Sequence, residues 1–482
     1  MISKGNLRAV ADAAEEQFRW CASVLAGLKG RNDCDYETTA QDVPGFQERL
    51  LKAIQSVERA YREIKQEERR LIDRKASYRP AWFARRMKTL SGYRSFLMEV
   101  LAIGRALGDG YAWFFYERDR DLIAEHFKHQ RQPLLPPGTG GLGEMHGLLK
   151  LQGFDHKALI YHGTTTFLRM GDVSFIDLKT MRVASIGEIK TKHHGGGRYT
   201  MNLALISHDR GNLPNVANFP QTESGEASLD PATAERQRRQ ARQIGEALTR
   251  ANALTSDKPS GPGVYGAFYY DALTEVVSKC GFDRFECARV SPGLLIAALR
   301  LKKGSLGDEL TGRVSSRWAR AADDLIVRAK EIIDETLPGN CLHIGHIGGR
   351  RQNLILRPES IPLLWWDLPH KVLEEILFGR VMVWTLYNPA YLWQKLQSRG
   401  FEMVFEDGKS ENPQATREID GRRMTLGNLE GYRDLLQRNL MSEESVLEMI
   451  DASIAFMEAA GFVSDTKIDV RTRFARYDGT AA

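Results

Sequence analysis

The segment GDVSFIDLKTMRVASIGEIKTKHH, from Gly171 to His194, constrains the fold of this chain more than any other. Two short apolar runs are separated by a polar stretch, a pattern typical of two strands joined by a hairpin. The apolar neighbours Ile186 and Ile189 predict that the second strand is a central element of a sheet. That strand also carries Glu188 and Lys190, which point to one face because side chains alternate along a strand. Such a pair requires either a solvated face, where it forms a weak surface pair, or a chemical role.

The elements around the hairpin predict a chain of three regions, within the two or three domains that 482 residues allow. Residues 1–130 are expected to form a helical assembly or regulatory region, and the Pro- and Gly-rich stretch 131–143 marks its end. Residues 131–275 are expected to contain a short helix from about Gly143, strands within 156–180, 183–192 and 199–208, a helix over 231–254 and a returning strand over 263–273. Residues 276–482 mix strand and helix patterns and are expected to form an additional α/β domain that selects the substrate or a partner.

The N-terminal region contains one strongly periodic segment, residues 46–75. Its apolar positions step by four and three residues and are interrupted at Glu68; they are Leu50, Ile54, Val57, Tyr61, Ile64 and Leu71. This period predicts either an amphipathic helix packed in a bundle or a dimerising coiled coil. The second alternative would make the protein a homo-oligomer through its N-terminal helices.

The hairpin resembles the PD-(D/E)xK nuclease superfamily through Asp172 in GDVSFID and Glu188 and Lys190 in GEIK. The order of helix, strands, helix and strand over about residues 138–275 fits that family. The resemblance implies an α/β (α+β) fold with a restriction-endonuclease-like core, in which helices flank a central mixed sheet. In one place the chain departs from the family, because Gly171 stands where proline is typical.

The resemblance further implies a nuclease that hydrolyses nucleic acid, with DNA favoured over RNA, and that requires Mg²⁺ or Mn²⁺. Asp172 and Glu188 would hold the metal, which suits an ion that binds through one or two carboxylates. Lys190 would orient or deprotonate the attacking water or stabilise the developing charge. Standalone combinations of this kind are typical of prokaryotic anti-phage defence or genome maintenance, so a partner protein in a defence complex is a further expectation. The rival hypothesis is an inactive nuclease-like fold that binds nucleic acid or acts as a scaffold.

The geometry of the hairpin makes a demand on its register. If the strands turn near 179–182, Asp172 lies opposite residues 189–191, and only an odd-length loop or a β-bulge brings the candidate residues to one face. Asp177 is the competing carboxylate, but it would lie opposite residues 184–186. At about 3.3 Å per residue it would be too far from Glu188 to share an ion.

Three supporting sites are expected from the residues near this hairpin. Glu144 precedes the first strand and is a candidate metal ligand, or an acid placed favourably at a helix N-terminus. Lys192 and Arg198 flank a glycine-rich loop that could bind phosphates, and the intervening His193 and His194 are more typical of a solvated loop. On the following helix Gln240 is the preferred substrate-binding residue, with Gln237 and Gln243 as alternatives to it, although the arginines beside them are also typical of a solvated face.

Composition excludes several other classes. The net charge of +5 is too small to indicate nucleic-acid binding by itself, although it permits a local basic surface. The five cysteines form no CxxC pair, so neither a zinc site nor a disulfide framework is expected, and a reducing cytoplasm is the expected location. The sequence has neither an apolar signal core nor an apolar run of about 18 residues, so we expect no membrane association.

Overall fold

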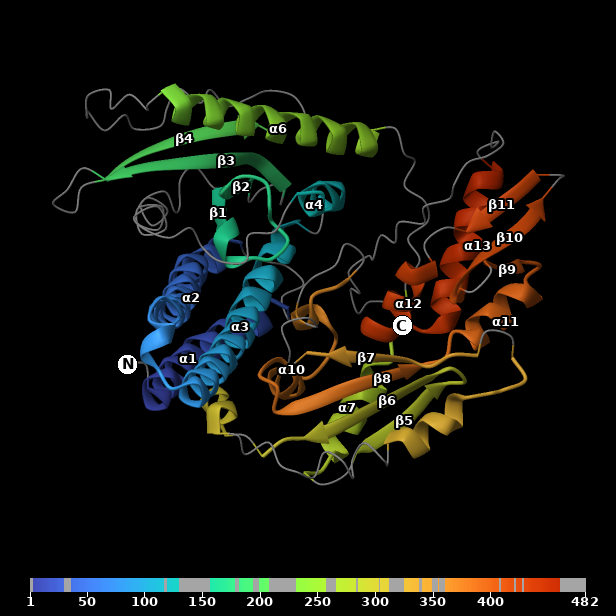
Figure 1. Cartoon of the computed structure of the whole chain (residues 1–482). Helices are drawn as coiled ribbons and strands as arrows, with labels where there is room; N and C mark the ends of the chain where they lie inside the picture. Colours follow the sequence, from blue (N-terminus) through green and yellow to red (C-terminus); the bar gives the residue numbers. More distant parts are fainter. Residues whose placement is uncertain are drawn as a thin grey trace. The chain divides into compact units, whose positions relative to one another are not determined.

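The computed structural model describes residues 3–29, 36–116, 119–129, 157–177, 182–193, 199–207, 231–256, 266–282, 285–302, 304–311, 325–337, 340–348, 354, 360–406, 409–419, 422–426 and 429–459. Contacts within the chain divide it into two compact units. The first contains Met1–Lys258 with Ser305–Leu310 and Ile355–Pro358, and the second contains the remaining residues up to Ala482. Figure 1 traces the elements of both units.

Three long helices form the N-terminal part of the first unit: α1 (Lys4–Lys29), α2 (Tyr36–Asp73) and α3 (Pro80–Tyr116). Each packs against the other two (Figure 1). The predicted apolar seam lies on α2, where Leu50, Ile54, Val57 and Ile64 are fully buried and Tyr61 is half-buried. Helices of the same chain therefore cover the seam, as the bundle alternative requires. At the interruption of the seam, Glu68 pairs with Arg94 of α3 at 3.0 Å.

Two glycines within three residues favour a helix break at Gly108–Asp109–Gly110, but α3 runs through these residues to Tyr116. A Cβ atom on Gly108 would lie 2.0 Å from the carbonyl oxygen of Thr164, so the glycine lets a loop approach the helix closely. The Asp109 carboxylate accepts hydrogen bonds from the backbone N–H and the hydroxyl of Thr166 in that loop. A short helix, α4 (Arg120–Phe127), follows α3.

The first unit also contains a four-stranded sheet in the order β1-β2-β3-β4. Its strands are β1 (Lys157–Tyr161), β2 (Val173–Asp177), β3 (Arg182–His193) and β4 (Tyr199–Ser207), and the helix α6 (Pro231–Ser256) packs against β3 and β4 (Figure 1). These elements confirm the predicted strands and helix, and β3 is central as expected. The predicted mixed sheet is not found in the described part of the chain, where every pairing is antiparallel.

The returning strand predicted over 263–273 is also wrong. Phe268 forms a single antiparallel bridge with Met441, and the chain then enters the helix α7 (Tyr270–Lys279). The apolar residues of this segment recur at helical spacing, and Tyr270, Leu273 and Val276 are buried. The contacts place the segment in the second unit, so it does not extend the sheet that contains the candidate residues.

The second unit contains two antiparallel sheets. One has the order β5-β6-β8-β7, and its strands are β5 (Glu286–Ser291), β6 (Leu294–Arg300), β7 (His343–Ile347) and β8 (Val381–Tyr387). The other has the order β11-β10-β9, and its strands are β9 (Glu402–Glu406), β10 (Lys409–Ile419) and β11 (Arg422–Leu426). Further helices are α10 (His370–Leu377), α11 (Ala390–Ser398), α12 (Leu429–Arg438) and α13 (Glu443–Ala459). The described residues include no helix that is both long and apolar enough to cross a membrane.

Candidate active site

A β-bulge in the β2–β3 hairpin decides which residue of β3 lies beside Asp172. Ile176 pairs with Val183, whereas the preceding residue of β2 pairs with Ser185, so one extra residue enters β3 between these pairs. Continuing this register places Asp172 opposite Glu188, and without the bulge it would lie opposite the preceding glycine. Residues opposite each other in antiparallel strands share a face. A bulge, one of the two alternatives that the sequence left open, is therefore present, and the extended register sets Asp172 beside Glu188.

The predicted partners along β3 need correction. Val173 pairs with Gly187, so the register extended by one residue places Asp172 opposite Glu188 rather than residues 189–191, and Asp177 pairs with Arg182 rather than with residues 184–186. Asp177 is thus six residues from Glu188 along the strand direction, or about 20 Å. The register therefore favours Asp172 over Asp177 more strongly than the sequence did.

Asp172 is fixed to β3 by both its backbone and its side chain. Its N–H donates to the carbonyl of Gly187 at 2.8 Å, and its Oδ2 accepts a hydrogen bond from the N–H of Ile189 at 2.7 Å. The side chain thus occupies a place where a backbone carbonyl would continue the ladder. Because the residue between these two anchors is Glu188, the carboxylate of Asp172 lies next to the Glu188 position.

The glycine at position 171 is explained by the turn that leads into Asp172. Gly171 has a φ of +67°, and a Cβ atom there would lie 2.7 Å from the carbonyl oxygen of Gly187. Proline fixes φ near −65°, so it cannot adopt this turn. The departure from the family pattern therefore reflects a different backbone path into the candidate site.

His162 holds the other side of the same turn. Its backbone N–H donates to the carbonyl of Asp172 at 2.9 Å, its Nδ1 lies 3.1 Å from the carbonyl of Gly171, and its Nε2 lies 2.6 Å from Oγ of Ser174. Burial lowers the pKa of His162 to about 4, so the ring is neutral at pH 7. Nδ1 then donates to Gly171, and Nε2 accepts from Ser174. Sequence reasoning missed this residue because its role depends on a turn that only the tertiary structure creates.

Several predicted site residues fall wholly or partly outside the described residues. Lys190, Lys192 and His193 have their backbones in β3, but their side chains are outside the described part of the chain. That Lys190 shares a face with Glu188 therefore stays a prediction from the two-residue spacing. Glu144, His194 and Arg198 also lie outside the described residues, and their roles remain predictions.

The glutamines on α6 are now distinguishable. Gln240 is half-buried, whereas Gln243 is exposed, and the side chain of Gln237 is outside the described residues. Gln240 precedes the buried Ile244 by four residues and the buried Ala247 by seven, so all three share one side of the helix. That side faces the interior, which agrees with the choice of Gln240 over Gln243.

α6 covers the face of the sheet that carries the candidate residues. A methyl group on Gly245 would contact Ile206 at 3.8 Å, and Ile206 pairs with Ile186, which shares a face with Glu188. The N-terminal end of α6 and the C-terminal end of β3 lie at the same end of this layer (Figure 1). Five helical residues from Gly245 to Gln240 advance about 7.5 Å, and two strand residues advance about 6.6 Å. Gln240 therefore lies near the level of Glu188.

The donor set fits a hard divalent cation. The described residues contain no group of three or more His, Cys, Asp or Glu side chains placed to hold a metal ion. A site here would rest on the two carboxylates of Asp172 and Glu188, and water and phosphate oxygens would complete the shell. Mg²⁺ is commonly held in this way, and carboxylate and water ligands also suit Mn²⁺.

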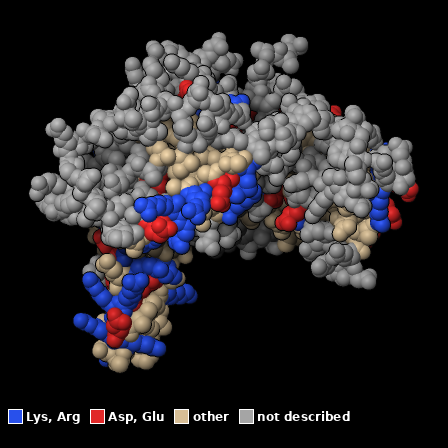
Figure 2. All heavy atoms as spheres, turned by 90° about the horizontal axis from the view of Figure 1, so that it is seen from above, with Lys and Arg blue, Asp and Glu red and all other residues tan. Residues whose placement is uncertain are grey.

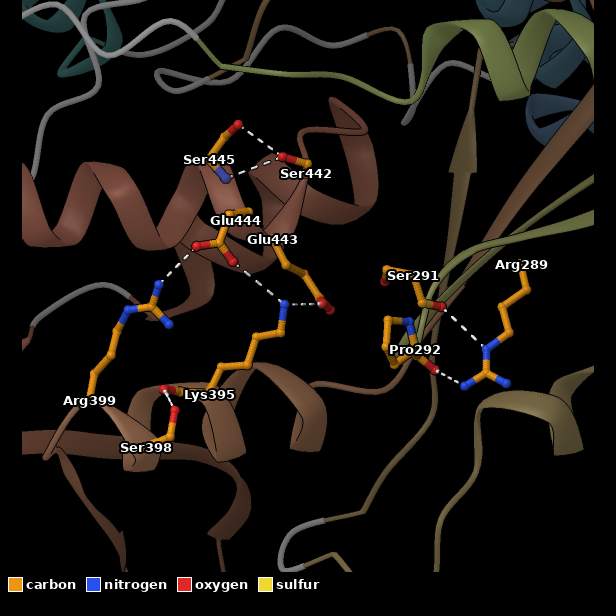
Figure 3. Close-up of polar contacts among 10 residues, drawn as sticks. All are labelled: Arg289, Ser291, Pro292, Lys395, Ser398, Arg399, Ser442, Glu443, Glu444 and Ser445. Carbon is orange, nitrogen blue, oxygen red and sulfur yellow. Dashed lines mark hydrogen bonds and ion pairs between the residues drawn. The ribbon is translucent and has the colours of Figure 1, made fainter.

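A buried carboxylate of a different kind lies in the second unit (Figure 3). Glu443 is 2% exposed and belongs to the first turn of α13, where Ser442 Oγ accepts from the N–H of Ser445 at 3.1 Å as an N-cap. Nζ of Lys395 lies 3.8 Å from a carboxylate oxygen of Glu443 and of Glu444. Burial raises the pKa of Glu443, and Lys395 opposes that effect. The N-terminus of α13 and Lys395 thus offset part of the cost of burying this acid.

Comparisons of the chain with protein-family models, with curated proteins and with solved structures give no match. The resemblance to the PD-(D/E)xK superfamily therefore rests on the hairpin residues themselves. Any function of this chain therefore has to follow from the chemistry of Asp172, Glu188 and Lys190 and from the elements that carry them.

Proposed function

We propose that this chain is a nuclease that uses Mg²⁺ or Mn²⁺ to hydrolyse phosphodiester bonds. The observation that carries the proposal is the β2–β3 bulge, because the register that follows it, extended by one residue beyond Val173, sets Asp172 opposite Glu188 instead of Gly187. A bulge costs ladder hydrogen bonds, and bulges are found preferentially next to active sites, where they redirect a side chain.

Each residue of the proposed site has a separate role. Asp172 and Glu188 bind the cation, and the N–H of Ile189 and the His162 turn hold Asp172 in position. When bound, the cation neutralises charge on the phosphate and lowers the pKa of its water. Lys190 orients the attacking water or stabilises the charge that develops on the phosphate, since a lysine can exchange a proton where an arginine cannot. Gln240 contacts Lys190 or the substrate from α6.

One observation favours the rival function, an inactive nuclease-like fold that serves as a scaffold or binds nucleic acid. Glu188 is only 4% exposed, and the Asp172 carboxylate already accepts a backbone hydrogen bond. Both side chains could therefore serve the fold alone, as buried polar groups with partners do. Only the nuclease function predicts a cleavage activity, and it predicts that removal of Lys190 abolishes this activity.

The deciding experiment measures cleavage of end-labelled single- and double-stranded DNA and RNA with Mg²⁺ or Mn²⁺. Wild type is expected to cleave at least one substrate, with DNA favoured, and Lys190→Ala is expected to be inactive although it folds. Asp177→Asn is the matched control, because it removes a carboxylate from the same hairpin, about 20 Å from Glu188 along the strand direction. This variant should retain activity.

Equal activity of wild type and Lys190→Ala would overturn the assignment of the site. If all four substrates remain uncleaved, Mn²⁺ binding is measured by calorimetry on wild type and Asp172→Asn. Binding that is lost in the variant supports the metal site, and absence of binding by wild type would establish the scaffold alternative.

A further inference from the structure

The tip of the α2–α3 helix pair concentrates the positive charge of the chain. We define the α2–α3 tip as residues 59–88, which include the single turn of 3₁₀ helix Lys75–Ser77 between the helices. This stretch contains eleven Lys or Arg residues and four Asp or Glu residues. Its net positive charge thus exceeds the +5 of the whole chain, so the remaining residues are slightly acidic together.

Two of the four carboxylates of this region form ion pairs inside the helix pair, whereas most of its cations are exposed. Arg86 of α3 donates to Glu67 of α2, and Arg94 donates to Glu68. The exposed cations are Arg59, Lys65, Arg69, Arg70, Arg74, Lys75, Arg79, Arg85 and Lys88, and the exposed carboxylates are Glu63 and Asp73. Figure 2 shows a projection on which blue side chains outnumber red ones.

Helix electrostatics explains only half of this arrangement. Arg70 and Arg74 lie at the C-terminal end of α2, where the helix dipole favours cations. Arg79 and Arg85 lie at the N-terminal end of α3, where the dipole disfavours them, and the first turn of α3 contains no acid. Several of these charges lie within a Debye length of each other and repel. A binding partner with negative charge would compensate for both unfavourable effects.

Aromatic side chains lie among these cations. Trp82 is 36% exposed, and its ring lies 4.9 Å from that of Tyr78, centroid to centroid. Nζ of Lys75 lies 5.7 Å from the centroid of the Phe83 ring. Cations that follow a phosphate backbone, together with an exposed ring for an unpaired base, are the features of single-strand binding surfaces.

We propose that the α2–α3 tip binds single-stranded nucleic acid, with the exposed cations on the phosphates and Trp82 stacked on a base. The cations extend from Lys75 back to Arg59, about 24 Å along α2. A helix that binds a membrane surface needs a continuous apolar face instead, and the apolar face of α2 is already buried against α1 and α3. Binding requires no cleavage, so this inference does not depend on the proposed nuclease activity.

The test is fluorescence anisotropy of labelled oligo(dT) at several NaCl concentrations in EDTA, where a metal-dependent nuclease cannot consume the probe. The tip variant combines Arg70→Gln, Arg74→Gln, Lys75→Gln and Arg79→Gln. The control combines Lys302→Gln, Lys330→Gln, Lys371→Gln and Arg423→Gln, exposed cations of the second unit with the same total charge. Glutamine keeps the helix propensity of the replaced residues.

The tip variant should weaken binding at least tenfold and reduce the slope of log K against log salt by about 3, since each phosphate contact on a single strand contributes about 0.7. The control variant should change neither quantity. Equal losses in both variants, or no binding by wild type, would overturn the proposal, whatever the cleavage assay shows.

Trp82→Ala separates base stacking from charge. It should weaken oligo(dT) binding about tenfold without changing the salt slope, because stacking releases no counterions. Binding to duplex DNA and to vesicles of phosphatidylcholine with phosphatidylserine is measured in parallel. Tighter binding to duplex with no effect of Trp82→Ala would contradict the single-strand preference, and tip-dependent binding to vesicles alone would replace nucleic acid by a membrane surface.

Discussion

Burial shifts the pKa of ionisable groups in both units of this chain, but in opposite directions. The first unit buries His126 and His162, with ring centroids 5.5 Å apart, and burial lowers the pKa of both. The second unit buries Glu443, and burial raises its pKa. In each case the low-dielectric interior favours the neutral form. Acidification therefore opposes folding around the histidines and favours it around the glutamate.

The surroundings of these groups distinguish a candidate site from a structural position. The neutral ring of His162 holds the turn that presents Asp172 to β3, beside Glu188, a second carboxylate. Glu443 instead faces Lys395 at the start of a helix. Burial alone thus does not mark a reactive acid. The neighbour of the carboxylate distinguishes the two cases. A cation such as Lys395 compensates the charge, whereas a second carboxylate leaves a negative charge that a bound cation would compensate.

The largest expected effect tests that distinction through activity. Asp172→Asn and Glu188→Gln, made separately, should each reduce the cleavage rate by about 10²–10³-fold, as the loss of one charge-stabilising group in an active site does. Asparagine retains an oxygen that can accept from the N–H of Ile189, so the turn is expected to persist. Initial rates with Mn²⁺ measure the effect.

Glu443→Gln is the matched control for Glu188→Gln, because it replaces a carboxylate that is also buried. Its cleavage rate should lie within about twofold of wild type, since the residue has structural partners only. Equal losses in all three variants would mean that the activity reports stability, and the comparison between the units would fail.

The hairpin shows how far the sequence could predict this site. Local pattern predicted both strands, the shared face of Glu188 and Lys190, and either a bulge or an odd-length loop. It could not locate the bulge, because no Asn-Gly or Asp-Gly turn fixes the register. The partner of Asp172 was consequently misplaced by one residue or more, and Asp177 was placed too close to Glu188.

Glycine and short apolar segments were the other sources of error, for a related reason. Gly108 looked like a helix break, but it serves a close contact with Thr164 that no local pattern encodes. The residues around Tyr270 are apolar over too short a distance to distinguish strand from helix, and packing in the second unit decides the outcome. Contacts distant in sequence therefore set the details that local propensity left open.

Acid sensitivity is the next largest expected effect, and it should appear in the first unit. His162 has a folded pKa of about 4 against an ordinary value of 6.5. Its contribution to stability is therefore complete above pH 6.5 and is lost as the pH falls toward 4, amounting to about 3 kcal/mol. Hydrogen exchange of peptides from β2 and β3, expressed as opening free energies, should follow this loss.

His162→Gln should flatten that pH dependence although it lowers stability at neutral pH. Glutamine cannot be protonated in this range, and its amide can still donate to Gly171 or accept from Ser174. Part of the slope should remain because His126 also resists protonation. An unchanged slope in the variant would remove His162 from the explanation.

The smallest expected effect is the opposite pH dependence in the second unit. Because the folded pKa of Glu443 is raised, its favourable contribution is complete below the ordinary carboxyl pKa of 4.5 and is lost as the pH rises through the folded value. Glu443→Gln should therefore gain stability relative to wild type with rising pH, by about 1 kcal/mol, a typical size for one substitution.

Glu444→Gln is the control, since its side chain faces the same lysine but is 58% exposed, and such a pair contributes little. Urea denaturation at pH 4.5 and 7.5 compares the variants. A relative gain for both would assign the effect to the charge of Lys395 and its surroundings rather than to the burial of Glu443.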